Sequence, residues 1–345
     1  MDWPPRRGLL SGLTVLAAIG VLAVIGRLWS AGLAPPSAGL AAPGREVLAT
    51  SRPVQGGVEF GQPVNGLAVT RAAVWIAHGT TIERLDPRTL RATARVRVPA
   101  VLNQPIAWPI RGIAAEPAGD AVWASLPTGL LRIDAASARV VATVPAAGVA
   151  PPAVGDAAVW VVCCGGETSL GAARLTRVDP VSNRVVAEIA LPGLPDAVAV
   201  GPSGVWVRGV AGPVWRVDPA SNRVVATVPV PPHGLGGAQG SVLVGRDAVW
   251  VSDPDSETAL RIDPRRNRIT SQAEVFGRAL AAAADGAVVA TGHGRLLRLG
   301  PGPVRSVDVD GINGEYVTAL ATLAGTIWIA TESGIVLHID QQAWR

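Results

Sequence analysis

The most constraining feature of this sequence is a short repeat that recurs along almost its whole length. Each copy contains a short apolar segment, a Val-Trp pair and a β-branched segment that ends in Asp, and a fourth apolar segment usually follows. Residues 205–229, VWVRGVAGPVWRVDPASNRVVATVP, carry the clearest copy. Runs of β-branched residues bounded by Gly, Pro, Asn and Asp are typical of strands. The repeat therefore predicts an all-β chain.

The spacing of the repeat indicates the architecture. The aromatic pair recurs at Val74-Trp75, Val122-Trp123, Val159-Trp160, Val205-Trp206, Val249-Trp250 and Ile327-Trp328. One further copy is degenerate, with Ala287-Val288-Val289-Ala290 where Val-Trp is expected. Counting it gives seven repeats of roughly 40–48 residues, the length of a four-stranded propeller blade. We therefore predict a seven-bladed β-propeller.

The two ends of the repeat region predict how the ring closes. The last repeat stops at Ile339-Asp340 and lacks its fourth strand, whereas an unassigned segment, Glu46 to Thr50, precedes the first repeat. This segment matches the fourth-strand residues Val224 to Thr227 in type. We expect it to become the outer strand of the last blade, because a closed ring leaves no exposed edge.

The N-terminus predicts a membrane anchor. Gly8 to Gly26 carries no charge and nearly spans a hydrocarbon core of ~30 Å, and the preceding Arg6 and Arg7 favour an N-terminus inside the cell. We therefore divide the chain into a cytoplasmic tip and transmembrane signal anchor (1–29), a flexible Pro/Gly-rich linker (30–44) and the propeller (45–345). The protein is then a single-pass cell-membrane protein with an extracytoplasmic domain. If the segment is instead a cleaved signal peptide, the protein is secreted.

Composition limits the classes of partner. All 30 basic residues are Arg, which together with the abundant Ala, Gly, Pro and Val indicates a GC-rich genome. The net charge is only +4, and the arginines are spread over the repeats without a dense cluster. Nucleic-acid binding is therefore not expected, and we expect a monomer.

The repeat also resembles known families. The order Val-Trp-Val, hydrophobic-Arg-Ile-Asp-Pro and Ser-Asn-Arg-Val-Val-Ala-Thr-Val-Pro resembles YVTN-type repeats and the seven-bladed propellers that include virginiamycin B lyase (streptogramin lyase). The resemblance covers about residues 45–345 and implies the propeller fold. For activity, it implies a carbon-oxygen lyase that uses Glu and His residues with a divalent metal near the central axis.

The residues of this chain match the lyase chemistry poorly. The four histidines are His78, His233, His293 and His338, and none forms a Glu-x-His pair. Only residues 328–332, WIATE, approximate the lyase-type strand, which leaves His293 and Glu332 as the candidate catalytic residues of an enzyme. Without that chemistry, we predict no cofactor and no metal site.

The candidate ligand-binding residues are those expected on the face formed by loops between the second and third strands and by the connections between blades. They are His78, Trp108, Arg208, Asp253, Asp255, Glu257 and Tyr316. Asp253-x-Asp255-x-Glu257 has the spacing of a Ca²⁺ loop but lacks its glycine and remaining oxygen ligands, so a hydrated acidic loop is expected.

Two further features have structural interpretations. The repeated Trp residues are expected to pack between blades, and the Arg-x-Asp pairs are expected to bridge neighbouring strands as solvated ion pairs. Cys163 and Cys164 are adjacent and can either form a strained disulfide in an oxidising compartment or remain as two thiols.

The sequence thus favours a non-catalytic binding or scaffold module that presents one propeller face to a protein, peptide or envelope ligand. The alternative is a metal-assisted lyase or hydrolase with its site on the same face. Fold alone does not decide between them.

Overall fold

The computed structural model describes residues 48–340, except 53, 99–109, 164–171, 211, 231–238, 255, 276, 278, 284–285, 292–293, 301–303 and 313. This part of the chain forms strands joined by turns and contains no helix. No membrane-spanning helix is therefore found among these residues. The expected anchor, Gly8 to Gly26, lies outside them and stays a prediction.

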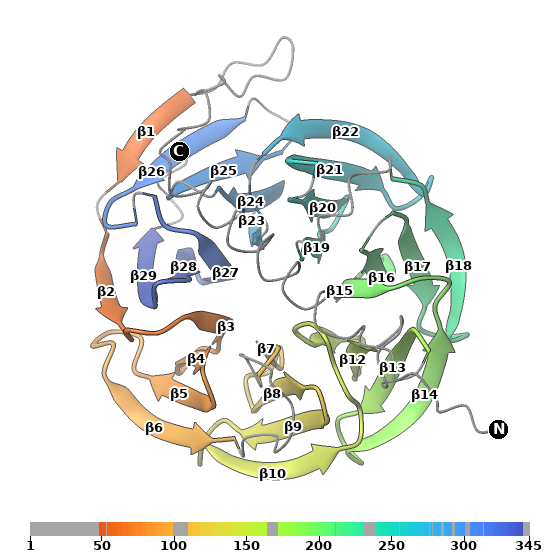
Figure 1. The fold of residues 1–345 in the computed structure, drawn as a ribbon, viewed down its shortest axis with the longest axis horizontal. Helices are drawn as coiled ribbons and strands as arrows, with labels where there is room; N and C mark the ends of the chain where they lie inside the picture. The colour runs from red at the N-terminus through yellow and green to blue at the C-terminus, as the bar shows by residue number, and fades with distance from the viewer. Residues whose placement is uncertain are drawn as a thin grey trace, which may run out of the picture. The chain divides into compact units, whose positions relative to one another are not determined.

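The strands form seven sheets arranged around a central axis (Figure 1). The prediction of a seven-bladed β-propeller is confirmed, including the degenerate sixth repeat.

The first four blades each contain four antiparallel strands in sequence order. Blade 1 consists of β3 (Val64–Val69), β4 (Val74–His78), β5 (Thr81–Leu85) and β6 (Ala92–Arg97). Blade 2 consists of β7 (Gly112–Ala115), β8 (Ala121–Leu126), β9 (Gly129–Asp134) and β10 (Arg139–Val144). Blade 3 consists of β11 (Ala153–Gly155), β12 (Ala158–Cys163), β13 (Arg174–Asp179) and β14 (Arg184–Ala190). Blade 4 consists of β15 (Pro195–Gly201), β16 (Gly204–Gly209), β17 (Val214–Asp218) and β18 (Arg223–Val228).

The remaining blades complete the ring and include the two N-terminal strands. Blade 5 consists of β19 (Ser241–Val244), β20 (Val249–Asp253), β21 (Thr258–Asp263) and β22 (Arg268–Glu274). Blade 6 consists of β23 (Leu280–Ala283), β24 (Gly286–Ala290), β25 (Arg295–Leu299) and β26 (Arg305–Val309), with β1 (Leu48–Arg52) as a fifth strand. Blade 7 consists of β27 (Val317–Leu323), β28 (Thr326–Thr331), β29 (Ile335–Asp340) and β2 (Gly56–Glu59).

An N-terminal outer strand closes the ring, but the strand differs from the one that we expected. β2 pairs with β29 and completes blade 7, with Val58 opposite Val336. The expected segment, 46–50, contributes instead to β1, which pairs in parallel with β26 on the outside of blade 6 (Figure 1). β2 is separated from β3 by only residues 60–63, so the short connection brings it to the last blade. Its sequence, GGVE, has only one β-branched residue, and the repeat pattern therefore missed it.

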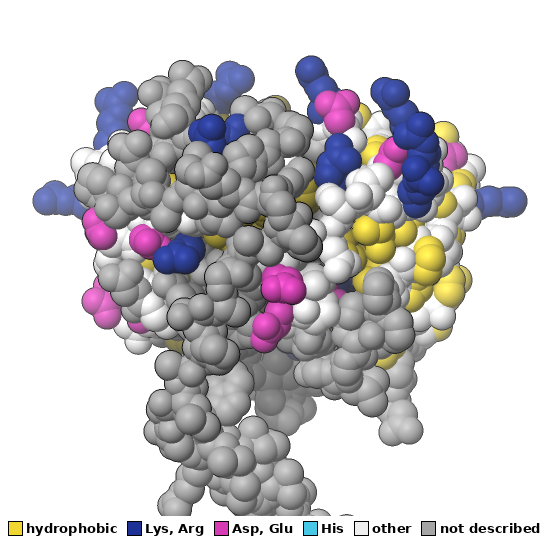
Figure 2. Space-filling view, turned by 90° about the horizontal axis from the view of Figure 1, so that it is seen from above, with side chains coloured by type: hydrophobic (Ala, Val, Ile, Leu, Met, Phe, Trp, Pro, Cys, Tyr) yellow, Lys and Arg dark blue, Asp and Glu magenta, His cyan; other side chains and the backbone are white. Residues whose placement is uncertain are grey.

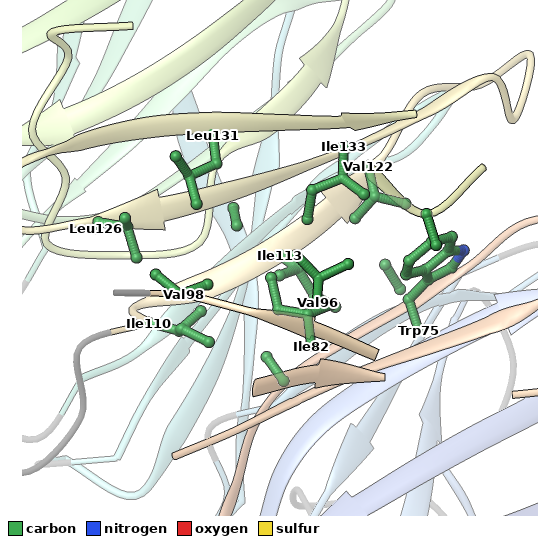
Figure 3. Packing of buried hydrophobic residues seen from close by; sticks show 14 of the residues in the cluster. Trp75, Ile82, Val96, Val98, Ile110, Ile113, Val122, Leu126, Leu131 and Ile133 are labelled. Carbon is green, nitrogen blue, oxygen red and sulfur yellow. The ribbon is translucent and has the colours of Figure 1, made fainter. Parts of the chain in front are cut away.

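The core lies between neighbouring blades. Seven clusters of buried apolar side chains fill the seven interfaces, and six contain the Trp of a second strand. Figure 3 shows the interface of blades 1 and 2, where Trp75 and Ile82 pack with Ile113, Val122 and Ile133. Packing of the repeated Trp between blades is thus confirmed. In blade 6, Val288 takes the Trp position in the cluster shared with blade 7.

The repeated Arg residues join neighbouring blades. Arg177 lies opposite Trp160 in the β12–β13 pair, and its guanidinium carbon is 5.2 Å from the centre of the indole ring. Its Nη1 atom then donates to the carbonyl of Pro219 in blade 4, at 2.6 Å. The arginines of blades 1, 2 and 4 likewise donate to carbonyls in the turn of the following blade. The arginines of blades 2, 3 and 4, which both stack on their Trp and reach the following blade, thereby couple the core to the next turn.

The repeated Asp residues stabilise their own turns, so the expected Arg-Asp bridges between strands were wrong. Asp179 accepts hydrogen bonds from the backbone N–H groups of Val181 and Ser182 and from the Ser182 hydroxyl. The Ser182 hydroxyl bond is the main cause that lowers the pKa of Asp179. The turn ends at Asn183, whose φ of +56° falls in the left-handed region that Asn tolerates. The same turn recurs in blades 1, 2, 4 and 5.

The charged side chains on the surface are dispersed. In the edge-on view of Figure 2, arginine side chains project from several separate places, with acidic side chains between them. Most of the basic side chains in this view stand apart, and a few adjoin one another at the upper right.

Candidate functional site

Buried polar side chains gather on one face of the propeller, which we call the channel face. It is the face where the first strand of each blade begins and the second strand ends. His78, Ser125, Arg208, Ser252, Asp253 and Thr331 lie at second-strand ends, and Asp196 lies at a first-strand start; all are at most 5% exposed. Because burying polar groups costs free energy unless they are hydrogen-bonded, this concentration of them marks the channel face as the candidate site.

Bulges turn three polar residues out of the ladder at the starts of first strands. The register of the first two strands shifts between Val64 and Gly66, between Pro195 and Ala197, and between Val317 and Ala319. The extra residues are Asn65, Asp196 and Thr318. Bulges are known to redirect side chains next to active sites, and these three line a cavity on the propeller axis.

Each of the three bulge residues also contacts the next blade. Thr318 Oγ1 donates to the Val64 carbonyl at 2.5 Å, and Asn65 Nδ2 donates to the Ile110 carbonyl at 2.5 Å. Asp196 Oδ2 accepts from the Gly240 backbone N–H at 3.3 Å. The bulges therefore fix the inner rims of neighbouring blades against one another.

The centre of the site is a buried group of three charges, Asp196, Arg208 and Asp253. Arg208 Nη1 donates to Asp196 Oδ2, and Arg208 Nη2 donates to Asp253 Oδ1 at 2.9 Å. The three side chains are at most 5% exposed. Asp253 Oδ2 also accepts from the Ser256 hydroxyl at 2.9 Å. With two carboxylates and one guanidinium, the group carries a net charge of −1 when both carboxylates are ionised.

Burial dominates the electrostatics of Asp196. It raises the pKa of this carboxyl group to about 6, although Arg208 and the Gly240 N–H oppose the shift. Gly240 is required at its position because a Cβ atom there would lie 2.6 Å from the Arg208 guanidinium carbon and 2.3 Å from the Ser252 carbonyl oxygen. The Gly240 backbone thus packs directly against the guanidinium and contributes to its burial.

The propeller fold itself does not require this charged group. Arg208 stands two residues after its blade's Trp, and the equivalent residues of the other described blades are Ala, Ser or Val: Ala77, Ser125, Val162, Ser252, Ala290 and Ala330. Those blades therefore fold with a small or apolar side chain at this position. The charged group is therefore specific to the site between blades 4 and 5.

The group borders a cavity of about 240 Å³ on the axis. Its polar lining includes Asn65, Arg111 and Asp196, and three of their buried atoms have no hydrogen-bond partner: Asn65 Oδ1, Arg111 Nε and Asp196 Oδ1. Two larger hollows of about 420 and 490 Å³ lie elsewhere, and neither is lined by a residue with such an atom. Of these three hollows, the axial cavity is the one lined by residues that carry buried atoms without a hydrogen-bond partner.

The structure brings together two of the residues that the sequence suggested, Arg208 and Asp253. Glu257 is exposed and has a φ of +52° in the β20–β21 turn. Tyr316 and Glu332 meet through the backbone, where the Glu332 N–H donates to the Tyr316 carbonyl at 2.9 Å. None of these three residues borders the axial cavity.

His78 belongs to a separate network in blade 1. Its Nδ1 atom lies 2.6 Å from Gln62 Nε2, and its Nε2 atom lies 3.3 Å from Glu83 Oε1. Arg95 Nε contacts the same Glu83 oxygen at 3.0 Å. The Phe60 ring lies over the imidazole with 4.9 Å between ring centres. This histidine has partners on both nitrogens and does not line the axial cavity.

Several sequence-predicted residues lie outside the described residues, namely Trp108, Asp255, His293 and Cys164. Cys163, the last residue of β12, is buried and its sulfur is disulfide-bonded. The pairing with Cys164 stays a prediction.

The divalent metal implied by the lyase resemblance does not fit the described side chains at the axis. Across residues 48–340, apart from the gaps given above, no group of three His, Cys, Asp or Glu residues is placed to hold a metal ion. The Asp196 carboxylate, which lines the cavity, is paired with the Arg208 guanidinium instead.

Sequence reasoning missed Asn65, Arg111 and Asp196. Each precedes a small residue at the start of a first strand, in Asn65-Gly66, Arg111-Gly112 and Asp196-Ala197. Aligning the first strands of all repeats would have shown polar residues at this one position. The bulges at Asn65 and Asp196, by contrast, are not visible in the sequence.

Comparisons with known proteins support the fold. No protein-family model matches the chain, and no curated protein matches its sequence. Among solved structures, it is similar to selenomethionine-substituted virginiamycin B lyase from Staphylococcus aureus, with a TM-score of 0.65 and 16% identity over 83% of this chain and 98% of that one. It is equally similar to a catalytically inactive variant of that lyase with quinupristin, with a TM-score of 0.66, 16% identity and the same coverage. The chain is thus a seven-bladed β-propeller with the fold of virginiamycin B lyase.

Proposed function

We propose that this protein is a membrane-anchored, extracytoplasmic binding module that holds a protein, peptide or envelope ligand on its channel face. The observation that carries the proposal is the buried group of Asp196, Arg208 and Asp253 at the axial cavity. Burying charged side chains destabilises a fold unless they are well paired. At the position equivalent to Arg208, the other blades have Ala, Ser or Val. A buried charged group that carries this cost fits ligand recognition.

The location rests on the N-terminal sequence. Gly8 to Gly26 serves as the anchor and residues 30–44 as a stalk, which places the propeller outside the cytoplasm. The disulfide at Cys163 supports an oxidising compartment.

The proposal is tested by ligand retention on the full-length protein. The detergent-solubilised chain is immobilised and exposed to envelope protein, peptide and glycan fractions from its native membrane. We expect one component to be retained by the wild type and lost with Arg111→Gln and with Arg208→Gln. The matched controls are Arg71→Gln and Asp247→Asn. These exposed residues lie in turns between a first and a second strand, at the end of the blade opposite the channel face. Both control variants should retain the component. Equal retention by all five proteins would exclude the channel face as the binding site.

The enzymatic alternative is tested separately with a defined substrate. The full chain is incubated with quinupristin in the presence and absence of Mg²⁺, and the products are analysed by mass spectrometry. Under our proposal the compound stays intact. Metal-dependent cleavage that is lost in Glu332→Gln would instead support the lyase alternative.

A further inference from the structure

The large apolar side chains that are exposed on the described surface all lie within residues 140–225, in blades 2 to 4. They are Val140, Val141, Val181, Val186, Leu194 and Val225. Val141, Val186 and Val225 are 54–55% exposed and occupy the same position of three outer strands, β10, β14 and β18, which follow one another around the rim (Figure 1). Exposed apolar residues that gather in one region mark a surface that another molecule covers.

A bulge in the outer strand turns this residue out of the ladder. In β14 the register shifts between Val185 and Ala187, so Val186 has no partner in β13. Blades 1 and 5 have the same bulge, but its residue is Thr93 or Thr270, whose hydroxyl group donates to a carbonyl of its own third strand. In blades 2 to 4 a valine replaces this internally bonded threonine, and the apolar side chain is left on the surface.

The bulge also restricts how a partner can bind. A fifth strand pairs with an outer edge in blade 6, where β1 lies alongside β26, and β26 itself pairs with β25 without a register shift. A bulge interrupts the regular row of backbone groups along a strand edge and thereby disfavours an added strand. We therefore expect contacts on the rim of blade 3 to be made by side chains.

Blade 3 departs from the other blades at two exposed positions of this rim. Val181, in the turn before β14, is 86% exposed, and the equivalent residues of blades 1, 2, 4 and 5 are Arg88, Ala136, Ala220 and Arg265. Glu188 is acidic where those four blades have Arg95, Thr143, Thr227 and Gln272. Its side chain is 58% exposed, and its Oε1 atom lies 3.1 Å from Arg174 Nε in β13.

The exposed face of β14 is complementary to itself. Arg184 and Glu188 lie two residues before and two residues after Val186, which is about 6–7 Å on either side of it in an extended strand. Both residues are exposed, and Arg184 forms no ion pair with a described residue. A two-fold axis perpendicular to the strand at Val186 places Arg184 of each copy opposite Glu188 of the other. Such self-complementarity is what an isologous dimer interface requires.

We propose that two copies of this protein form a symmetric dimer through the rim of blade 3, with Val186 at the two-fold axis and an Arg184–Glu188 ion pair on each side. Val181 adds apolar contact area beside the axis. The inference goes beyond the proposed function, because this rim is separate from the channel face, and it differs from the monomer that we expected from the sequence. β1, which joins the propeller to the predicted anchor, lies on the opposite side of the ring and leaves this rim free (Figure 1). The dimer brings two channel faces into one assembly.

Charge reversal tests the proposed symmetry. Sedimentation equilibrium of the full-length protein in density-matched detergent measures the dimer dissociation constant. Arg184→Glu and Glu188→Arg should each raise this constant at least about tenfold, because each places like charges opposite one another. An equimolar mixture of the two variants should dimerise as tightly as the wild type, since the acidic rim of one variant then faces the basic rim of the other. The double variant, which carries both changes, should also dimerise like the wild type.

Val186→Asp tests the apolar centre of the interface. It places two carboxylates against each other at the two-fold axis and should raise the dissociation constant at least about tenfold. The matched controls are Arg268→Glu and Gln272→Arg, at the equivalent exposed positions of blade 5, and both should leave the constant unchanged. Thermal melting shows whether each variant is folded. Should one charge reversal fail to fold, the other reversal and Val186→Asp carry the test.

Three outcomes would overturn the inference. A wild type that stays monomeric would leave the exposed valines to another occupant, a different protein or lipid. Dimerisation that no blade 3 variant changes would place the contact elsewhere in the chain. Loss of dimerisation in both charge reversals, without recovery in their mixture, would exclude the two-fold arrangement.

Discussion

Arg208 shows how a single residue can depart from the repeat that surrounds it. The repeat places Ala, Ser or Val two residues after the second-strand Trp, and blade 4 places a guanidinium there. That guanidinium lies between two buried carboxylates, on Asp196 and Asp253. The residue is therefore both a functional candidate and a point on which local stability depends.

Replacing Arg208 with Met should strongly destabilise the protein. The substitution leaves two buried carboxylates without their shared counter-ion, and removal of one partner from a buried ion pair typically costs about 3–5 kcal/mol. Urea denaturation measures the loss in the free energy of unfolding. Arg71→Met, at an exposed turn, should change it by less than about 0.5 kcal/mol. Similar small effects for both variants would show that the buried charges are not coupled.

The pH dependence of stability should separate Asp196 from the turn aspartates. The pKa of Asp196 is about 6 in the folded protein, against ~3.9 in an unfolded chain. Between these values the folded state holds a proton that the unfolded state has lost. The free energy of unfolding should therefore fall as pH rises from 4 to 6, by about 2 kcal/mol.

The turn aspartates have the opposite sign. Hydrogen bonds lower the pKa of Asp86, Asp134, Asp179, Asp218 and Asp263, so their contribution is present above pH ~4 and is lost as pH falls further. Denaturation of the wild type and Asp196→Asn at pH 4, 5, 6 and 7 checks the assignment. The wild type alone should lose the Asp196 contribution between pH 4 and 6. A difference between the two proteins that does not change with pH would contradict it.

The turn between the third and fourth strands is the element that repeats most faithfully. Asp begins it, and its fifth residue has a positive φ in blades 1 to 5. Asn occupies that fifth position at 183, 222 and 267, whereas blade 1 has Leu90 and blade 2 has Ala138. The Asn of blades 3 to 5 also lies near the arginine of the preceding blade.

This difference predicts opposite effects of exchanging Asn and Ala. Asn222→Ala should lower the free energy of unfolding by about 1 kcal/mol, because left-handed backbone disfavours Ala and the contact with Arg177 is lost. Ala138→Asn should raise it by about the same amount. Both changes are measured by thermal or urea denaturation. If both variants shift in the same direction, backbone conformation is not what selects Asn at this turn.

Ring closure depends on one of the two N-terminal strands. β2 supplies the outer strand of blade 7, whereas β1 extends blade 6, which already has four strands. Val58→Pro removes a ladder donor within β2 and should destabilise the ring by several kcal/mol. The matched change in β1, Thr50→Pro, should have a much smaller effect on the melting temperature. A larger effect of Thr50→Pro would instead indicate that β1, the segment predicted from the sequence, closes the ring.

For the whole molecule, the repeat predicted the blade number, the degenerate blade and the inter-blade packing of Trp. These features follow from the spacing of the repeats and from the apolar pattern within each repeat, and both can be read directly in the sequence. Closure was predicted in kind but assigned to the wrong segment, because Gly56–Glu59 lacks the strand pattern. The site was predicted only in part. Arg208 and Asp253 were identified, but Asp196, Asn65 and Arg111 line one cavity only because the ring brings blades 1, 2 and 4 around it, which the sequence of one repeat does not record.

The most direct test of the account is site-specific photo-crosslinking in native membranes. A benzophenone amino acid replaces one exposed residue at a time: Gln239 beside the axial cavity, Val186 on the outer strand of blade 3, or Asp247 in a turn away from the cavity. We predict a crosslinked envelope component from position 239 that disappears when Arg111→Gln is added, and none from position 186 or 247. Crosslinking of that component from position 186 or 247 alone would contradict the channel face as the functional surface.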